Sequence, residues 1–290
     1  MPIGLRIIGI IIAVLAAAYG LYAGMGNSTG NFDGEMQIFA LDVGQGDSFF
    51  IISPNGKTML IDSGESSNSK QIEQFIREKG VRQLDVVIGS HTHSDHVGSM
   101  PYLLDAFDVG KYVMSEAGLE TRIQKRINAV LEEKDIPCSY VWAGDVIDWD
   151  SDCKVTVLSP VPEFDEYSKT DWNEWSLIIR AEYANHSMIF TGDATVRSEQ
   201  AAMLNNEKYL FDADVLKVPH HGSTTSSSLG FLEAVSPEYA IISVGKGNSY
   251  GHPDYDTIQK LNQVNAEIYR TDELGTINIV FSADDIKITY

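Results

Sequence analysis

A run of three histidines and one aspartate within six residues, directly after an apolar segment, constrains this chain more than any other feature. The run is HTHSDH at residues 91–96, and residues 84–89 (LDVVIG) before it have the composition of a buried β-strand. The end of such a strand delivers side chains to a loop at the rim of a sheet, where functional sites lie. Imidazole and carboxylate ligands without a thiolate suit zinc, with manganese or iron as alternatives. The run therefore predicts a metal site at the edge of a sheet.

The spacing within this run separates the four ligand-type residues into two pairs. His91 and His93 are two residues apart and can point the same way. Asp95 and His96 follow on the turning chain and can serve a second ion. Six residues cannot complete the shells of two ions, so we expect further ligands from distant parts of the chain.

Candidates for these ligands lie where other predicted strands end. Asp193 ends the apolar stretch 187–193 (SMIFTGD), in which a glycine precedes the carboxylate. His252 lies just past the stretch 239–245 (YAIISVG). We expect His252 to contact an ion or a substrate, with local turn hydrogen bonding as the alternative.

Two adjacent histidines, His220 and His221, follow the stretch 214–219 (DVLKVP). Adjacent side chains in a strand face opposite sides of a sheet, but at a turn both can reach one cavity. We therefore expect at least one of the two to be a ligand.

His186 is excluded from the site by its position in a predicted hairpin turn at residues 184–186. It precedes Asp193 by seven residues, and a strand rises about 3.3 Å per residue, so the two should lie roughly 20 Å apart. We interpret His186 as a surface turn residue.

The pattern from residue 35 onward is that of one mixed α/β domain. Short Phe- and Ile-rich stretches predict strands, apolar residues at helical spacing predict helices, and Asn55-Gly56 predicts a turn. Expected strands occupy residues 36–43, 48–53, 58–64, 84–89, 176–183, 187–193, 214–219 and 239–245, with two or three more in 138–157 and others at the C-terminus; expected helices occupy 69–79, 120–134, 197–204, 229–235 and 254–264.

The N-terminus differs from the rest, because residues 7–23 are apolar and carry no charge. Seventeen residues at 1.5 Å each span roughly 25 Å, near the lower limit for crossing a bilayer. Residues 1–24 are thus either an uncleaved signal anchor or a signal peptide, and residues 25–34 form a flexible linker. This arrangement predicts a catalytic domain at residues 35–290 that is extracytoplasmic, either anchored to the membrane or secreted.

Charge and cysteine content exclude some functions. With 41 acidic and 21 basic residues the net charge is −20, which argues against a general nucleic-acid binder. Two cysteines cannot build a four-cysteine zinc site. Cys138 and Cys153 form one disulfide if the chain is exported, or remain two free thiols.

The order of the motifs resembles that of a known family. HTHSDH, with LIDSG at 60–64 and FTGDA at 190–194, resembles the metallo-β-lactamase superfamily. The finer resemblance is to the C-terminal domain of the ComEC competence-protein family and its stand-alone relatives, and it adds LDVGQGDS (41–48), NEWSLIIR (173–180), DVLKVPHHGS (214–223), SVGKGNSYGHP (243–253) and YRTDELG (269–275). The resemblance implies an α/β fold of four layers, an αββα sandwich, here preceded by one N-terminal hydrophobic helix. It also implies a hydrolase with two metal ions at one edge of the sheets.

The resemblance further implies a role for each candidate residue. His220 would contact a substrate oxyanion, Asp62 would orient a ligand histidine, and Asp47 would lie near the site in a role left open. The implied ligands are His91 and His93 for the first ion, Asp95, His96 and His221 for the second, and Asp193 as the bridge between them.

One departure from the superfamily pattern concerns the first ion. Most members supply a third histidine between the HxHxDH loop and the bridging aspartate, but no histidine lies between His96 and His186. Asn173 stands in this interval, so the first ion would be held by His91, His93, the bridge, and the Asn173 amide or a water.

The implied cofactor is a pair of divalent ions, Zn²⁺ or alternatively Mn²⁺, which lower the pKa of a shared water and provide hydroxide near neutral pH. Asp95 would hold this nucleophile, while His220 or His252 would stabilise the developing charge.

We predict a phosphodiesterase acting on a small-molecule or cell-wall substrate, with the membrane as a further partner of the N-terminal helix. A nuclease associated with DNA uptake is the first alternative, although the net charge disfavours DNA. A local basic patch would have to outweigh that charge, drawn from Lys217, Lys246, Arg122, Lys125 and Arg126. A catalytically dead, membrane-tethered binding protein is an alternative of another class, and hydrolysis of a lactam is disfavoured.

Overall fold

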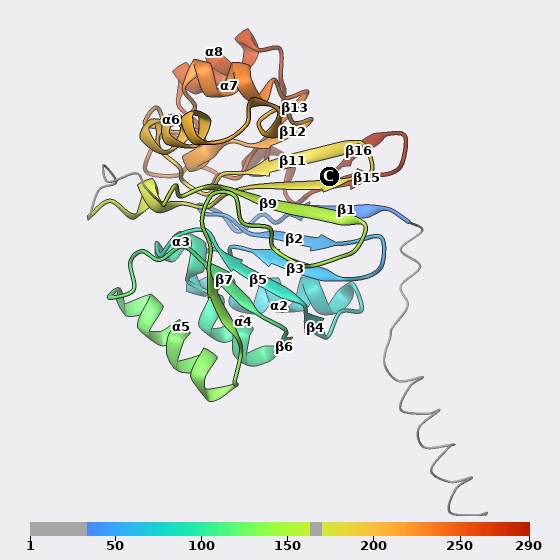
Figure 1. Ribbon diagram of the computed structural model, residues 1–290, viewed down its shortest axis with the longest axis vertical. Coiled ribbons are helices and arrows are strands. Elements are labelled where there is room, and N and C mark those ends of the chain that lie inside the picture. Colours follow the sequence, from blue (N-terminus) through green and yellow to red (C-terminus); the bar gives the residue numbers. More distant parts are fainter. Residues whose placement is uncertain (1–33, 163–169) are drawn as a thin grey trace, which may run out of the picture. The chain divides into compact units, whose positions relative to one another are not determined.

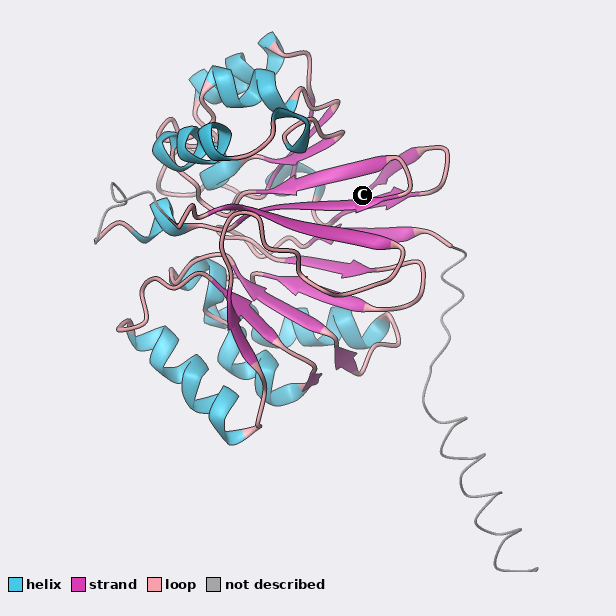
Figure 2. Ribbon diagram, viewed as in Figure 1, coloured by secondary structure: helices cyan, strands magenta, loops and turns pink. Residues whose placement is uncertain are grey.

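Two β-sheets lie face to face at the centre of the structure, and helices cover the outer face of each (Figures 1 and 2). This computed structural model describes residues 34–162 and 170–290. The predicted N-terminal hydrophobic helix lies outside the described residues, as does the predicted linker up to residue 33. Within the described residues, none of the helices has the length and apolar character needed to cross a membrane.

The first sheet has eight strands in the order β16-β15-β1-β2-β3-β5-β7-β8. Strands β1, β2 and β3 pair antiparallel as a meander, whereas β5, β7 and β8 continue from β3 in parallel. Its strands are β1 (Met36–Ala40), β2 (Phe49–Ile52), β3 (Thr58–Ile61), β5 (Val86–Gly89), β7 (Tyr112–Met114), β8 (Cys138–Tyr140), β15 (Ile277–Phe281) and β16 (Ile286–Thr289).

The second sheet has six strands in the order β14-β13-β12-β11-β10-β9. Strands β9, β10 and β11 pair antiparallel, and β11 to β14 run in parallel. Its strands are β9 (Cys153–Ser159), β10 (Ile178–Tyr183), β11 (His186–Phe190), β12 (Val215–Lys217), β13 (Tyr239–Ile242) and β14 (Glu267–Arg270).

Helices form the outer layers because each presents one apolar stripe to a sheet. The stripes of α2, α4 and α5 pack on the first sheet, and those of α6, α7 and α8 pack on the second. The helices are α2 (Ser69–Glu78), α3 (Ser94–Val97), α4 (Met100–Ala106), α5 (Arg122–Glu133), α6 (Val196–Asn205), α7 (Leu229–Val235), α8 (Tyr255–Gln263) and α9 (Thr271–Leu274), with 3₁₀ turns η1 (Ser66–Asn68), η2 (Trp172–Trp175), η3 (Lys208–Leu210) and η4 (Pro219–Gly222).

Strand β5 shows why the segment before the histidine run is apolar on both faces. Val86 and Ile88 pack into the core between the two sheets, whereas Val87 packs into the core beneath the helices. A strand buried on both sides reads as a continuous apolar run rather than as an alternating one. The expected strand at 84–89 is nevertheless divided, because β4 (Gln83–Leu84) pairs with β6 (Asp108–Val109) in a separate two-stranded sheet.

Two short helices, α3 and α4, have no counterpart among the predicted elements. Helix α3 contains the second half of the histidine run, and α4 begins immediately after Ser99. Pro101 in the first turn of α4 is a helix-start signal, and Met100, Leu103 and Leu104 are buried. Their seven or fewer residues are too short for a periodic pattern to stand out.

The structure contains two free thiols rather than the alternative disulfide. Cys138 is exposed on β8 and Cys153 is half-buried on β9. The two strands are edge strands of different sheets, and Cys153 Sγ lies 4.0 Å from Met36 Sδ of β1. Burial raises the pKa of the Cys153 thiol to about 12.

The topology brings several strand ends to one edge of the sandwich. Strands β11, β12 and β13 are parallel neighbours, so their carboxyl ends meet at the same edge of the second sheet. The loops that follow them carry Asp193, the two histidines of η4, and His252. The histidine run leaves β5 of the first sheet at this same edge, where its side chains face these loops.

Candidate metal centre

The turn from β5 into α3 presents the histidine run. His93 has extended backbone angles and is the residue immediately before α3, whereas His91 lies in the bend that follows β5. Asp95 then occupies the first turn of α3, and His96 the same short helix. The change from extended chain to helix directs these side chains toward one interior region.

His96 is held by a carboxylate behind it. Its Nδ1 lies 2.8 Å from Asp62 Oδ2, and its ring is fully buried. Asp62 also accepts hydrogen bonds from the backbone N–H of Ser90 at 2.8 Å and from the Ser90 hydroxyl at 2.7 Å. Because the carboxylate accepts, Nδ1 carries the proton and the Nε2 lone pair of His96 faces the centre.

His221 is oriented in the same way by a backbone carbonyl. Its Nδ1 donates to Ser243 O at 2.8 Å, so its Nε2 lone pair also faces the centre. His220, His221 and Gly222 are consecutive residues with φ of 53°, 53° and 85°. Left-handed backbone at non-glycine residues costs of order 1–3 kcal/mol each, and such strain gathers at functional sites.

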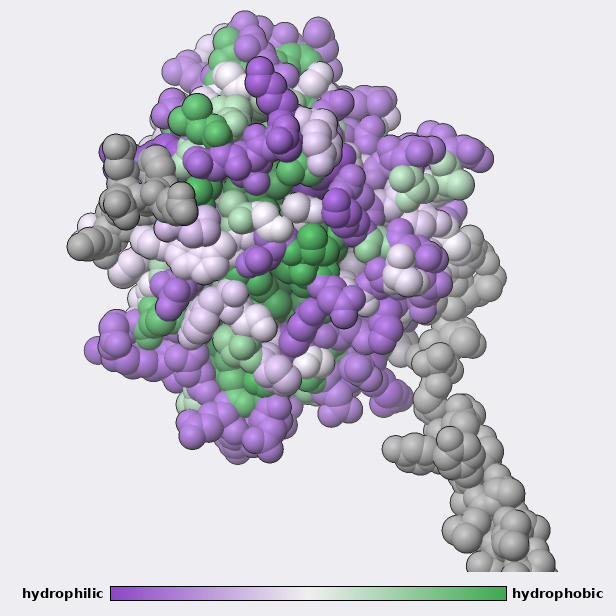
Figure 3. Space-filling model, viewed as in Figure 1, coloured by the Kyte–Doolittle hydropathy of each residue, from purple (hydrophilic) through white to green (hydrophobic). Residues whose placement is uncertain are grey.

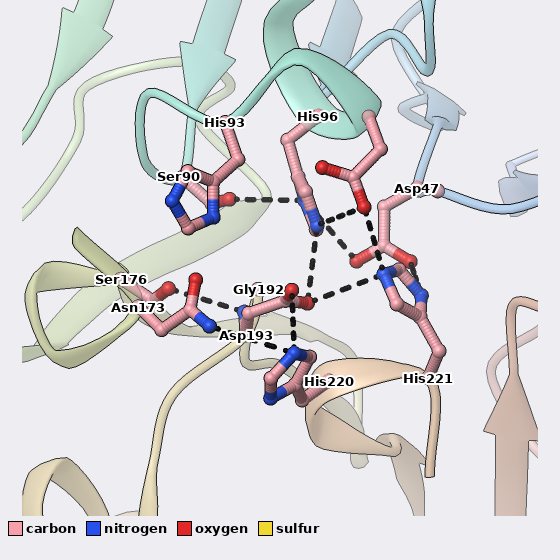
Figure 4. Close-up of polar contacts among 12 residues, drawn as sticks. Asp47, Ser90, His93, His96, Asn173, Ser176, Gly192, Asp193, His220 and His221 are labelled. Carbon is pink, nitrogen blue, oxygen red and sulfur yellow. Dashed lines mark hydrogen bonds and ion pairs between the residues drawn. The ribbon is translucent and has the colours of Figure 1, made fainter. Parts of the chain in front are cut away.

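Four ligand-type residues converge in front of these two rings. One nitrogen or oxygen atom from each lies within 4.8 Å of all the others. His96 Nε2 is 3.1 Å from Asp193 Oδ1, and His221 Nε2 is 3.6 Å from the same oxygen (Figure 4). Asp95 Oδ2 lies 3.4 Å from His221 Nε2 and 3.9 Å from His96 Nε2.

These separations are close to those between neighbouring ligands of a tetrahedral ion, roughly 3.4 Å for bonds near 2.1 Å. His96 Nε2, His221 Nε2 and Asp193 Oδ1 are buried and lack a hydrogen-bond partner in the described part of the chain. Three buried lone-pair atoms facing one another require a cation or protons between them. The residues present therefore fit a divalent ion.

The pKa values of the group show how strongly its charges interact. Burial alone would lower the pKa of His96, but Asp193 and Asp62 raise it well above the usual range. The pKa of His221 rises to about 9, because Asp193 and Asp47 outweigh burial. His96 and His221 in turn outweigh burial at Asp193 and hold its pKa well below the usual range.

His91 and His93 form a second pair beside this group. His91 Nε2 lies 3.1 Å from His93 Nδ1, and Ser90 Oγ lies 3.0 Å from His91 Nδ1. Burial, with a smaller contribution from His96, lowers the pKa of His91 well below its usual value, so this ring is neutral. Two imidazoles with facing nitrogens suit one ion, although the four-residue group described above includes neither.

His220 and Asn173 lie on the other side of the bridging candidate. His220 Nε2 is 3.5 Å from Asp193 Oδ2 and 3.4 Å from Asn173 Nδ2 (Figure 4). Its Nδ1 lies 2.9 Å from Thr225 Oγ1. The amide that stands in the interval of the missing third histidine is thus in contact with His220.

A cavity of about 290 Å³ opens onto these residues. His252 lies on its wall, with its ring 6.0 Å from that of His220 and its Nδ1 3.4 Å from Asp254 Oδ2. Tyr250 stacks on His252 at 5.8 Å and is 70% exposed. The cavity is lined by Gln45, His93, Ser94, Asp95, Asn173, Asp193, His220, His221, Tyr250 and His252.

Residues 41–246 match the family profile described as the Metallo-beta-lactamase superfamily. The chain belongs to this superfamily. The expected resemblance is confirmed at the level of sequence as well. The chain is 34% identical over 260 residues to ComE operon protein 3 of Bacillus subtilis (strain 168), a match that covers 84% of this chain and 33% of the relative.

Two further relatives show the same relationship. Identity is 29% over 257 residues to Recombination protein 2 of Haemophilus influenzae, covering 87% of this chain and 30% of the relative. It is 28% over 256 residues to Competence protein ComA of Neisseria gonorrhoeae, covering 88% and 34%. The chain spans about a third of the length of these relatives.

Solved structures confirm the metallo-β-lactamase fold. Igni18, a metallo hydrolase from Ignicoccus hospitalis, has a TM-score of 0.58 at 15% identity, with 85% of this chain and 100% of the other covered. The metallo-beta-lactamase fold protein YhfI from Bacillus subtilis has a TM-score of 0.55 at 13% identity, with 88% and 99% covered.

Two sequence expectations about single residues need correction within this metallo-β-lactamase fold. Lys217 cannot belong to a surface basic patch, because only 1% of its surface is exposed. His186 is not in a surface turn but is the first residue of β11, half-buried against the ring of Phe281. It does lie at the opposite end of β11 from Asp193, as the strand-length argument predicts.

Sequence reasoning also missed residues that support the ligands. Ser90 contacts both Asp62 and His91, and Ser243 fixes the ring of His221 through its carbonyl. No chemical signal marks a serine or a backbone carbonyl as a partner of a ligand. Position was the available signal, since each of the two residues directly follows a buried strand.

Proposed function

We propose that this metallo-β-lactamase superfamily chain is a phosphodiesterase with a two-ion centre. The observation that carries the proposal is the convergence of His96 Nε2, His221 Nε2 and Asp193 Oδ1, all buried and without hydrogen-bond partners among the described residues. Each histidine already donates its other nitrogen's proton to an acceptor, so the free lone pairs are suited to a metal.

In this proposal Asp193 is the bridge between two sets of ligands. Asp95, His96 and His221 would hold one ion together with Asp193, and an atom of each of the four lies within 4.8 Å of the others. His91 and His93, with the amide of Asn173, would hold the other. A donor set of imidazoles and carboxylates without a thiolate suits Zn²⁺, with Mn²⁺ as the alternative.

When bound, two such ions would supply a hydroxide near neutral pH from a coordinated water. The chain's own residues would position the reactants. Asp95 is suited to hold the nucleophile, because His96 and His221 outweigh burial and lower its pKa to about 2, which leaves it an ionised acceptor. It lies on the cavity wall and is about a quarter exposed.

His220 and His252 are the proposed donors to the oxygen on which charge develops. Thr225 Oγ1 lies against His220 Nδ1, and Asp254 lies against His252 Nδ1, so each ring is held from behind. Both rings line the cavity. A donor already in place costs little reorganisation during the reaction.

A small or cell-wall phosphodiester is the proposed substrate because the chain carries a net charge of −20. Nuclease activity on DNA is the second candidate, favoured by the similarity to ComE operon protein 3 and to Competence protein ComA. The charge-free stretch at residues 7–23 supports an extracytoplasmic enzyme, either anchored or secreted. A periplasm-active reporter fused after Asn31 should then be active only outside the cytoplasm; cytosolic activity alone would contradict this location.

The activity is tested by measuring kcat/KM of the purified full chain for bis-p-nitrophenyl phosphate, DNA and a lactam, before and after metal removal. We expect phosphodiester cleavage that is lost with a chelator and restored by Zn²⁺ or Mn²⁺. Asp193→Asn should lower kcat/KM by at least 100-fold, and His186→Ala should leave it unchanged. Activity that survives complete metal removal, or activity only on the lactam, would contradict the proposal.

A further inference from the structure

Lys217 places a buried positive charge directly beneath the proposed centre. It is the last residue of β12 and is 1% exposed. Its Nζ donates to Gly192 O at 2.7 Å, forms an ion pair with Asp47 Oδ2, and lies 3.9 Å from Asp193 Oδ1. Burying an ammonium is costly unless it is paired and hydrogen-bonded, so this position needs a specific role.

The carboxylate that pairs with Lys217 faces both proposed ligand histidines. Asp47 Oδ1 lies 3.4 Å from His221 Nδ1, and Asp47 Oδ2 lies 3.6 Å from His96 Nδ1. The backbone N–H of Asp47 donates to Asp95 O at 3.1 Å. Gly46 permits this approach, because a Cβ there would lie 2.2 Å from that same oxygen.

The carbonyl that Lys217 contacts belongs to the turn that aims the proposed bridge. Gly192 O accepts from Lys217 Nζ and also from the backbone N–H of His220 at 3.2 Å. Gly192 has φ of 49°, and Ser90 packs so closely that a Cβ would lie 2.7 Å from its hydroxyl. The ammonium thus ties together the turn before Asp193 and the backbone of His220.

A second group of residues could hold a cation by its geometry alone. Asp47, Asp62 and His96 are all buried, and one atom of each lies within 4.8 Å of the others. A metal ion bound there would lie on the Nδ1 side of His96. It would compete for the Asp62 carboxylate that orients the His96 ring. The Lys217 ammonium already neutralises Asp47 in this group.

We propose that Lys217 is a positioning residue whose buried ammonium takes the place of a metal ion beside Asp47. It holds the Gly192 turn so that Asp193 presents both oxygens, and it keeps metal ions off the Asp47, Asp62 and His96 group. This inference rests on the proposed two-ion centre. Lys217 lies behind the ligands and does not line the cavity, so its effect reaches the reaction through the residues it holds.

The test compares metal binding by the full chain and by Lys217→Met, which keeps most of the length of the side chain but removes its charge and donors. We expect about two ions per wild-type chain. The Lys217→Met variant should release its weaker ion at a zinc-chelator concentration at least tenfold lower than the concentration that the wild type requires. The visible spectrum after loading with Co²⁺ should also change, because it reports the geometry around the ion. Lys217→Arg should restore binding to within about threefold of wild type.

Lys57→Met is a matched control, since Lys57 forms an exposed ion pair with Asp85, and it should bind metal like the wild type. Circular dichroism checks the fold of each variant. If Lys217→Met does not fold, the double variant Asp47→Asn/Lys217→Met removes both charges together. Its metal binding is then compared with that of the wild type. We expect it to bind metal weakly too, because Gly192 O still lacks the hydrogen bond from Lys217 Nζ.

The outcomes separate this inference from the proposed function. A wild-type chain that binds only one ion, or none, would contradict the two-ion centre itself, and the inference with it. Two ions in Lys217→Met, with wild-type affinity and an unchanged Co²⁺ spectrum, would overturn the role of Lys217 alone. Wild-type affinity in the double variant would show that Lys217 only neutralises Asp47, which also overturns the positioning role.

Discussion

His220 and His221 are consecutive residues that face different oxygens of the Asp193 carboxylate. His220 Nε2 lies 3.5 Å from Asp193 Oδ2, and His221 Nε2 lies 3.6 Å from Asp193 Oδ1. Two successive left-handed residues make this possible, because an extended backbone would send the rings to opposite faces of the sheet. The stored strain is balanced by a fixed partner for each Nδ1, namely Thr225 Oγ1 and Ser243 O.

The two histidines should differ when each is replaced by alanine. We expect His221→Ala to lower the metal content of the full chain by about one ion, because its Nε2 belongs to the converging ligand group. His220→Ala should keep the metal and lower kcat about 100-fold, as expected for a lost donor to the transition state.

Metal analysis and steady-state kinetics on the same preparations check this difference. The reverse pattern would exchange the two roles. Loss of metal in both variants would make His220 a ligand near Asn173, in place of the missing third histidine.

Asp193 should matter to both ions, and His186 to neither. Asp193→Ala removes the carboxylate that both adjacent histidines face, so we expect the full chain to lose both ions in elemental analysis after dialysis. His186→Ala is the matched control, because His186 lies at the other end of β11 and packs on Phe281. Normal metal content in Asp193→Ala would disprove the bridging role, and metal loss in His186→Ala would disprove the strand-length argument.

The metal-free chain should lose stability as the pH rises through the range 6.5 to 9. An unfolded histidine releases its proton near pH 6.5, whereas His221 in the folded chain holds it to about pH 9. The folded state then binds more protons than the unfolded state, so the free energy of unfolding falls with pH across this window, by a few kcal/mol. The stabilisation is complete below pH 6.5, and His96 contributes in the same direction.

Thermal melting of the metal-free chain between pH 6 and 9.5 tests this sign. His91 has the opposite shift, but its effect on stability is confined to pH values below 6.5. Zinc replaces the protons, so the metal-loaded chain should show a much flatter profile, and His221→Ala should flatten the metal-free one. A metal-free melting temperature that rises between pH 6.5 and 9 would contradict the assigned charges.

The salt dependence of cleavage should distinguish an enzyme for a small phosphodiester from a nuclease. An acidic surface repels polyanions over a Debye length, roughly 8–10 Å at physiological salt. Added salt should therefore leave DNA cleavage unchanged or raise it slightly, and bis-p-nitrophenyl phosphate should be cleaved at least as readily per site. The comparison is kcat/KM for both substrates from about 50 to 200 mM salt. DNA cleavage that is strong at low salt and collapses over this range would indicate a basic groove and favour the nuclease.

The sequence alone determined the family, the order of most elements and the place of the site. Runs such as residues 84–89 and 214–219 are mostly apolar because their strands are buried, and ligand-type residues follow where each run ends. The chemistry of the HTHSDH run is likewise local, since the run itself contains the ligand types and their spacing. These features can be predicted because they depend on residues close together in the chain.

Only the tertiary structure decided which residues contact and orient the candidate ligands. His96 meets Asp62 from 34 residues away, and Lys217 of one sheet pairs with Asp47 from a loop of the other. Such pairs depend on how two sheets stack, and no local pattern records that packing. From the sequence, Lys217 is expected to be an ordinary surface lysine. Its burial is tolerated because the Asp47 carboxylate balances its charge and the Gly192 carbonyl accepts a hydrogen bond from it.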